Sequence, residues 1–123
     1  MATHPPPNRL PQVLLIEPDP DLATALTLFL EAGGHRVDRV ESTSSHGDRL
    51  NVVGYDAVVL DADRLDQPTA SFIASCALPV VVCTRSTEPT VHAEFLSFGA
   101  RTVLLKPFPM DELGAAVFVA LMG

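Results

Sequence analysis

Five short apolar segments, spaced evenly along the chain, constrain its fold more than any other feature of the sequence. Three of them, VLLI, AVVL and PVVVC, are apolar throughout and do not alternate with polar side chains. A sheet with one face in water shows alternation, whereas parallel strands covered on both faces show continuous apolar runs. The segments with strand character are residues 13–16, 36–40, 57–60, 79–83 and 102–105.

Segments with helical periodicity lie between these runs. Leu22, Ala25, Leu26, Phe29 and Leu30 share one face of a helix over residues 20–32, which two glycines end. Residues 44–50 and 69–76 show weaker helical patterns, and residues 90–98 and 111–122 clearer ones. Strands and helices that alternate five times predict an α/β fold, with a parallel sheet, right-handed crossovers and helices on both faces. Five strands in a chain of this length predict a flavodoxin-like doubly wound sheet of order 2-1-3-4-5.

The length of 123 residues fits one domain, and 47% apolar residues can build a core. The proline-rich residues 1–11 are predicted to form a disordered tail, and residues 12–123 the domain. A net charge of −7 argues against direct nucleic-acid binding. Neither a membrane-spanning apolar run nor a signal peptide is visible, so we expect a cytoplasmic domain without membrane contact.

Polar residues of complementary chemistry follow four of the predicted strands. In a sheet of this order the site lies beyond the carboxyl ends of the strands, at the switch between the first and third. A carboxylate nucleophile, a cation and a hydroxyl at one edge are what phosphoryl transfer to a carboxylate requires. Lys106 is the only lysine of the chain, which favours a positional requirement for it. The strand-end residues are Glu17, Pro18, Asp19, Asp61, Asp63, Thr84 and Lys106.

The segments VLLIEPDPDL, YDAVVLD, PVVVCT, FGA and LLKPF together resemble the signature segments of response-regulator receiver domains, the CheY-like superfamily of two-component signalling. The resemblance covers about residues 13–122. It implies that Asp61 is the phosphoacceptor, that Thr84 is the switch hydroxyl and that Lys106 binds the phosphoryl group. It also implies a sensor histidine kinase or a phosphotransfer protein as the partner.

The same resemblance implies a Mg²⁺ site formed by Glu17, Asp61 and the backbone carbonyl of Asp63. Glu17 stands at the first position of the family's acidic pair. Pro18 stands at the second position, whose carboxylate normally binds the metal, and proline brings no ligand. We therefore expect magnesium to bind weakly.

Four further departures from the family pattern bear on the function. Val103 replaces the aromatic residue that usually changes rotamer with the threonine, and Arg85 replaces a small residue. The stretch between Asp61 and Thr84 is short, and Leu65 stands where a proline is usual. These changes put the switching mechanism in doubt more than they do the fold.

Two functions remain open from the sequence. In the first, the domain is a working receiver that accepts a phosphoryl group on Asp61 and signals by covalent modification, without being a metabolic enzyme. In the second, it is a degenerate pseudo-receiver that binds partners independently of phosphorylation, as Pro18 and Val103 suggest. A flavin-binding electron carrier is disfavoured, because an anionic segment follows the first strand where a phosphate-binding loop would be needed.

The last predicted helix has no charged residue after Glu112. Its periodicity leaves Phe118, Val119 and Met122 on the outer face, and such a patch usually marks an interface. We expect a homodimer or an effector to bind there. A neighbouring domain or the proline-rich tail covering the patch remains an alternative, because the chain can be a complete protein or a fragment.

Overall fold

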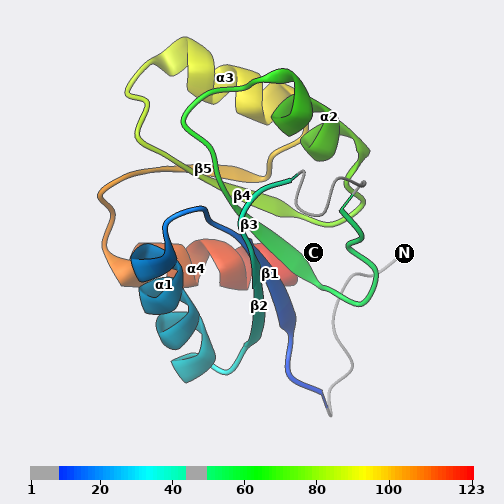
Figure 1. Cartoon of the computed structure of the whole chain (residues 1–123), viewed down its shortest axis with the longest axis vertical. Helices are drawn as coiled ribbons and strands as arrows, with labels where there is room; N and C mark the ends of the chain where they lie inside the picture. Colours follow the sequence, from blue (N-terminus) through cyan, green and yellow to red (C-terminus); the bar gives the residue numbers. More distant parts are fainter. Residues whose placement is uncertain (1–8, 44–49) are drawn as a thin grey trace.

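The computed structural model describes residues 9–43 and 50–123. The described residues form one parallel five-stranded sheet and four helices, arranged as in Figure 1. In chain order the elements are β1 (Gln12–Ile16), α1 (Pro20–Ala32), β2 (Arg36–Val40), β3 (Ala57–Asp61), α2 (Gln67–Ser75), β4 (Val80–Thr84), α3 (Pro89–Ser97), β5 (Thr102–Leu105) and α4 (Met110–Leu121). The strand order is β2-β1-β3-β4-β5 and every neighbouring pair is parallel. The predicted flavodoxin-like order 2-1-3-4-5 is confirmed.

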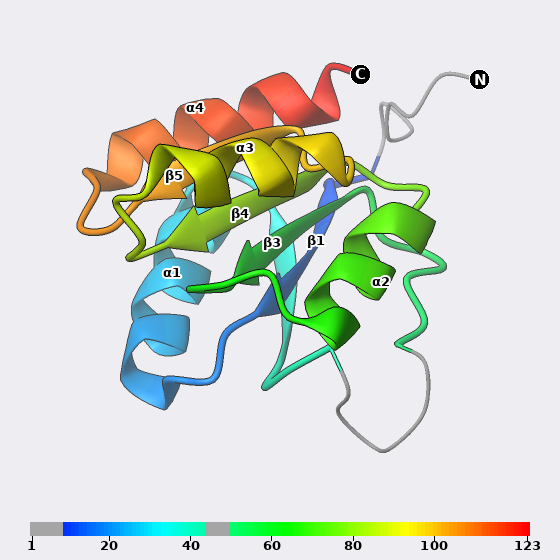
Figure 2. The same ribbon diagram turned by 90° about the horizontal axis from the view of Figure 1, so that it is seen from above.

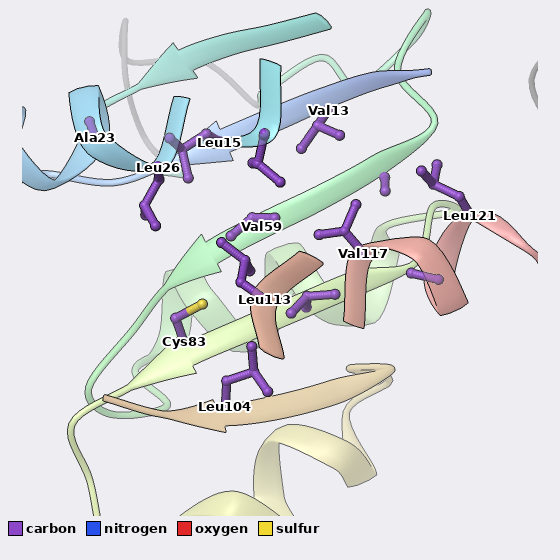
Figure 3. Packing of buried hydrophobic residues seen from close by; sticks show 14 residues of the cluster. Val13, Leu15, Ala23, Leu26, Val59, Cys83, Leu104, Leu113, Val117 and Leu121 are labelled. Atoms are coloured by element: carbon purple, nitrogen blue, oxygen red, sulfur yellow. The ribbon is translucent and has the colours of Figure 1, made fainter. Parts of the chain in front are cut away.

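Two helices cover each face of the sheet (Figure 1). Alternate residues of the central strands enter two separate apolar clusters, so Val13 and Leu15 pack beneath α1 and α4 while Leu14 and Ile16 pack beneath α2 and α3. Figure 3 shows the first cluster, where Leu26 of α1 and Leu113 of α4 meet the sheet. Burial on both faces is the physical reason for the continuous apolar runs of the sequence.

The side of α1 that faces the core differs by one residue from the predicted one. Ala23, Leu26 and Leu30 are buried, whereas Ala25 is exposed. Asp19 sets the start of the helix, because its Oδ1 accepts hydrogen bonds from the N–H groups of Asp21 (2.9 Å) and Leu22 (3.3 Å). The buried residues of α1 are thus spaced i, i+3 and i+7, counted from Ala23.

Two predictions on the chain's organisation remain predictions. The helix expected at residues 44–50 lies outside the described residues except for Leu50, which is not helical. Of the predicted tail, residues 1–8 are also outside them. Residues 9–11 lie against the domain, where Arg9 pairs with Asp56 at 3.3 Å and Pro11 accepts a backbone hydrogen bond from Arg36. Among the helices at 9–43 and 50–123, none is both long enough and apolar enough to cross a bilayer.

Candidate phosphoacceptor site

The carboxyl ends of the strands bring the predicted site residues to one edge of the sheet. The strands β3 and β4 point toward the same edge (Figure 2), and Asp61 is opposite Cys83 in their register. Glu17 directly follows β1, and Lys106 directly follows β5. The parallel arrangement thus converts four separate strand ends into one group of polar side chains.

Lys106 bridges two carboxylates at this edge. Its Nζ donates a hydrogen bond to Asp61 Oδ1 and lies 3.5 Å from Glu17 Oε1. The side chains of Lys106 and Asp61 are 15% and 13% exposed. Burial alone would lower the pKa of Lys106, but the hydrogen bond and charge of Asp61, together with the charge of Glu17, raise it overall. The structure therefore brings together three of the predicted residues as a charged triad.

Glu17 is the most buried acid of the triad, with 2% of its surface exposed. Its Oε2 accepts a hydrogen bond from the Asp19 N–H at 3.2 Å, whereas its Oε1 accepts none from the residues described. Burial, reinforced by the negative charge of Asp61, raises the pKa of Glu17 despite the Asp19 N–H and Lys106. One buried carboxylate oxygen therefore remains available to an additional donor or cation.

Arg39 of β2 fixes the segment that follows Glu17, a role that sequence reasoning missed. Its Nε donates to the Glu17 carbonyl at 2.9 Å, and its Nη2 donates to the Pro18 carbonyl at 3.1 Å. Its position follows from the pairing of β1 with β2, which places Arg39 opposite Leu15, two residues before Glu17. The Glu17 and Pro18 carbonyl oxygens thus already have a cationic partner.

Thr84 is fully buried at the end of β4 and does not contact Asp61 through a hydrogen bond. Its Oγ1 accepts from the Ser86 N–H at 3.1 Å, and its carbonyl accepts from the Lys106 N–H at 2.7 Å. The structure therefore connects Thr84 to Lys106 through the backbone, and the predicted role of its hydroxyl stays a prediction.

Asp63 and Arg85 form a second charged pair, across the loops that follow β3 and β4. The Arg85 backbone N–H donates to Asp63 Oδ1 at 2.9 Å, and Arg85 Nε and Nη2 donate to Oδ2 at 3.0 and 2.5 Å. These hydrogen bonds hold the pKa of Asp63 below its usual value. Sequence reasoning named both residues but missed their pairing, whose only signal was opposite charges after adjacent strands.

Two pockets of about 540 Å³ each open beside the triad. The first pocket is lined by Asp61, Asp63 and Pro18 among others. Pro18 therefore borders this pocket at the position where the family pattern has the second residue of its acidic pair. The second pocket is mostly apolar and is lined by Leu22, Leu26, Arg85, Lys106, Pro107, Phe108 and Met110. Asp61 is therefore accessible from a cavity, as an acceptor requires.

Receiver domains as a class bind Mg²⁺ at their phosphorylation site. In this chain the Asp61 carboxylate and the Glu17 Oε1 both lie against the Lys106 ammonium, and the predicted ligand set of Glu17, Asp61 and the Asp63 carbonyl stays a prediction. Pro18 adds no side-chain ligand, and Lys106 contacts both carboxylates. No group of three His, Cys, Asp or Glu side chains able to hold a metal occurs in the described parts of the chain. The weak magnesium binding expected from Pro18 therefore stays a prediction.

Known proteins of similar sequence are transcriptional regulators. No protein-family model matches the chain. Over 111 residues it is 30% identical to the transcriptional regulatory protein BasR of Escherichia coli and 32% identical to CutR of Streptomyces coelicolor. These alignments cover 86% of this chain and 50% and 51% of the two relatives. The chain thus spans about half the length of the curated relatives it matches.

Solved structures resemble the chain over nearly its whole length. The non-phosphorylated HemR receiver domain of Leptospira biflexa superimposes with a TM-score of 0.76 and 25% identity, covering 90% of this chain and 94% of that one. A two-component response regulator of Clostridium difficile gives a TM-score of 0.78 at 23% identity, covering 90% and 95%. The fold is that of solved receiver domains. The chain belongs to the CheY-like response-regulator receiver domains.

Proposed function

We propose that this domain accepts a phosphoryl group on Asp61 from a sensor histidine kinase or a phosphotransfer protein in the cytoplasm, and then signals through its surface. The observation that carries the proposal is the Lys106 ammonium bound to the Asp61 carboxylate beside an open pocket. A domain of this kind is a covalently modified signalling protein and not a metabolic enzyme.

The transfer requires one bond to form and one to break. The free oxygen of Asp61 attacks the phosphorus of a phosphohistidine, the P–N bond breaks, and its electron pair returns to the imidazole nitrogen. Lys106 stays protonated and binds a phosphoryl oxygen as the charge moves onto Asp61. Mg²⁺, when bound by Glu17, Asp61 and the Asp63 carbonyl, would supply further charge neutralisation for the phosphoryl oxygens.

The test is intact-mass spectrometry after incubation with acetyl phosphate and magnesium. We expect the wild-type chain to gain one phosphoryl mass and Asp61→Asn to gain none. Asp111→Asn, which removes an exposed acid at the start of α4, is the matched control and should behave as wild type. The same mass gain in Asp61→Asn would remove Asp61 from the role.

A second candidate function, the phosphorylation-independent interaction module, is favoured by the outer face of α4. Phe118, Val119 and Met122 are 61%, 60% and 59% exposed, as the helical periodicity predicts. Val103 is half-buried against the other face of the sheet and offers no aromatic lever. In this case the face binds a second copy or an effector constitutively.

Light scattering across a concentration series tests the homodimer. Burying three large apolar side chains in a dimer predicts a concentration-dependent increase in mass that Phe118→Glu abolishes. Leu28→Glu alters a 63% exposed leucine of α1 and serves as the control. A strict monomer at every concentration would exclude the homodimer and leave an effector as the occupant.

A further inference from the structure

The edge around Asp61 differs from the family pattern by one lost anion and one gained cation. Pro18 removes a carboxylate from the position bordering the pocket, and Arg85 adds a guanidinium directly after the buried Thr84. Both changes alter the charge balance in the same direction, toward a site that needs less cation from solution.

The guanidinium of Arg85 is held in one orientation. Asp63 Oδ2 accepts hydrogen bonds from Nε and Nη2, while Asp63 Oδ1 accepts from the Arg85 backbone. An arginine presents five N–H donors in a planar fork, so a carboxylate on the Nε–Nη2 edge leaves the Nη1 edge for a second acceptor. Within residues 9–43 and 50–123, Arg85 Nη1 has no hydrogen-bond partner.

Arg85 and the cation that binds Asp61 lie around one pocket, whereas Asp61 itself lines the other. Arg85 lines the same pocket as Lys106, whose ammonium is bound to Asp61. The negative charges of Asp61 and Glu17 both act on the guanidinium. The Arg85 side chain is 75% exposed, so an incoming group can reach it from solvent.

We propose that Arg85 is a second phosphoryl-binding cation of this receiver: Asp63 orients its guanidinium, and its Nη1 edge binds one oxygen of the phosphoryl group on Asp61 while Lys106 binds another. The proposal rests on the proposed function. It implies that acceptance and retention of the phosphoryl group depend little on magnesium, whose expected site lacks one side-chain ligand because of Pro18. A hydrogen bond from a guanidinium N–H to a phosphoryl oxygen is charge-assisted and stronger than a neutral one.

A purely structural role for the pair is the competing explanation, and it makes a different prediction. An exposed ion pair contributes little stability. If Arg85 only fastened the two loops, removing either partner would have the same consequence. If Arg85 binds the phosphoryl group, removing Arg85 must cost more than removing the charge of Asp63.

The experiment measures phosphorylation of the whole chain by acetyl phosphate, once with EDTA and once with magnesium. The acetyl phosphate P–O bond breaks, acetate leaves with its electron pair, and the new P–O bond is to Asp61. With EDTA, we expect Arg85→Ala to react about 10- to 100-fold more slowly than wild type, the cost of a lost charged hydrogen bond. Arg85→Lys should lie between them, because a lysine keeps the charge without the fork.

Two further variants separate the explanations. Asp63→Asn keeps Arg85 and should lose much less than Arg85→Ala. Arg101→Ala removes an exposed arginine just before β5, at the amino ends of the strands, whereas Asp61 lies at their carboxyl ends. This variant should match wild type. Thermal melts confirm that all variants fold.

The outcomes distinguish this proposal from the one it rests on. Phosphorylation of wild type with Arg85→Ala unchanged in EDTA, or with Asp63→Asn equally slow, overturns the role of Arg85 and leaves the acceptor role of Asp61 intact. Wild type that takes up no phosphoryl group under either condition overturns both.

Discussion

Two buried carboxylates at opposite ends of neighbouring strands are treated very differently. Asp56, just before β3, is 8% exposed and both of its oxygens accept hydrogen bonds, from the Gln12 N–H at 2.7 Å and from Arg9 at 3.3 Å. Glu17, just after β1, is 2% exposed, and one of its oxygens accepts no hydrogen bond from the described residues. Its nearest cation, Lys106, is shared with Asp61.

The difference is what we expect between an acid that stabilises the fold and an acid of the proposed phosphoacceptor site. A buried carboxylate costs stability unless donors compensate it, and Asp56 has donors on both oxygens. At the other end one ammonium serves two carboxylates, and burial raises the pKa of Glu17. The Glu17 carboxylate thus has fewer donors than it could accept. Such a carboxylate can still bind a charged group or an ion, as the proposed site requires. Substitutions at both ends of these strands test that contrast.

The largest effect is expected at the amino end. Asp56→Ala should lower the free energy of unfolding by about 3 kcal/mol, because it leaves the Gln12 N–H without its acceptor and Arg9 without its partner. Urea denaturation measures the loss. Asp56→Asn keeps an acceptor for Gln12 and should cost about 1 kcal/mol. Equal stability of all three proteins would mean that Asp56 is not structural.

The next effect is expected in the triad. Lys106→Met should cost about 2 kcal/mol at neutral pH, since it leaves Glu17 and Asp61 facing each other without a cation. Removing the ammonium raises the pKa of Glu17 further, so the deficit should shrink as the pH falls toward 4.5, its ordinary value. Adding Glu17→Gln should restore most of the loss at neutral pH. A deficit that grows on acidification would contradict this account.

The third effect concerns Pro18, which stands where the family pattern has an acid. Pro18→Asp places a carboxylate on the border of the Asp61 pocket and should tighten magnesium binding about tenfold, from a millimolar or weaker affinity. Calorimetric titration of both proteins checks this. Leu28→Asp, on the outer side of α1, controls for added charge alone. Micromolar affinity of the wild-type chain would show that Pro18 removes no needed ligand.

The fold could be predicted from the sequence because strands that are buried on both faces of the sheet have continuous apolar sequences. Glycines and prolines also mark the ends of the helices. The site edge was also predictable, since strand ends fix where Glu17, Asp61 and Lys106 meet. The pairing of Asp63 with Arg85 and the hydrogen bonds from Arg39 were not. They depend on which strands are neighbours and on side-chain rotamers, and charged residues carry no periodicity that reveals a partner.

The Arg9–Asp56 pair was missed for a related reason. Arg9 lies in a proline-rich stretch, whose composition predicts a tail. Asp56 is a single acid before a predicted strand, and nothing near it in the sequence indicates a partner. Only the contact between them, 47 residues apart in sequence, makes either one structural. Long-range compensation of a buried charge has no local pattern.

The smallest effect is expected at Glu17 itself. Because its folded pKa is above the unfolded value, the stability it contributes is fully present below the unfolded pKa and is lost as the pH rises through the folded one. Glu17→Gln should therefore be more stable than wild type by up to about 1 kcal/mol at neutral pH, with the gap closing on acidification toward 4.5. Asp63 and Asp66, whose pKa values are lowered, lose their contributions at lower pH in both proteins and cancel in the difference. Urea denaturation across this range gives the measurement, with the exposed Glu112→Gln as the control. A Gln variant less stable than wild type at neutral pH would mean that Glu17 is as well compensated as Asp56.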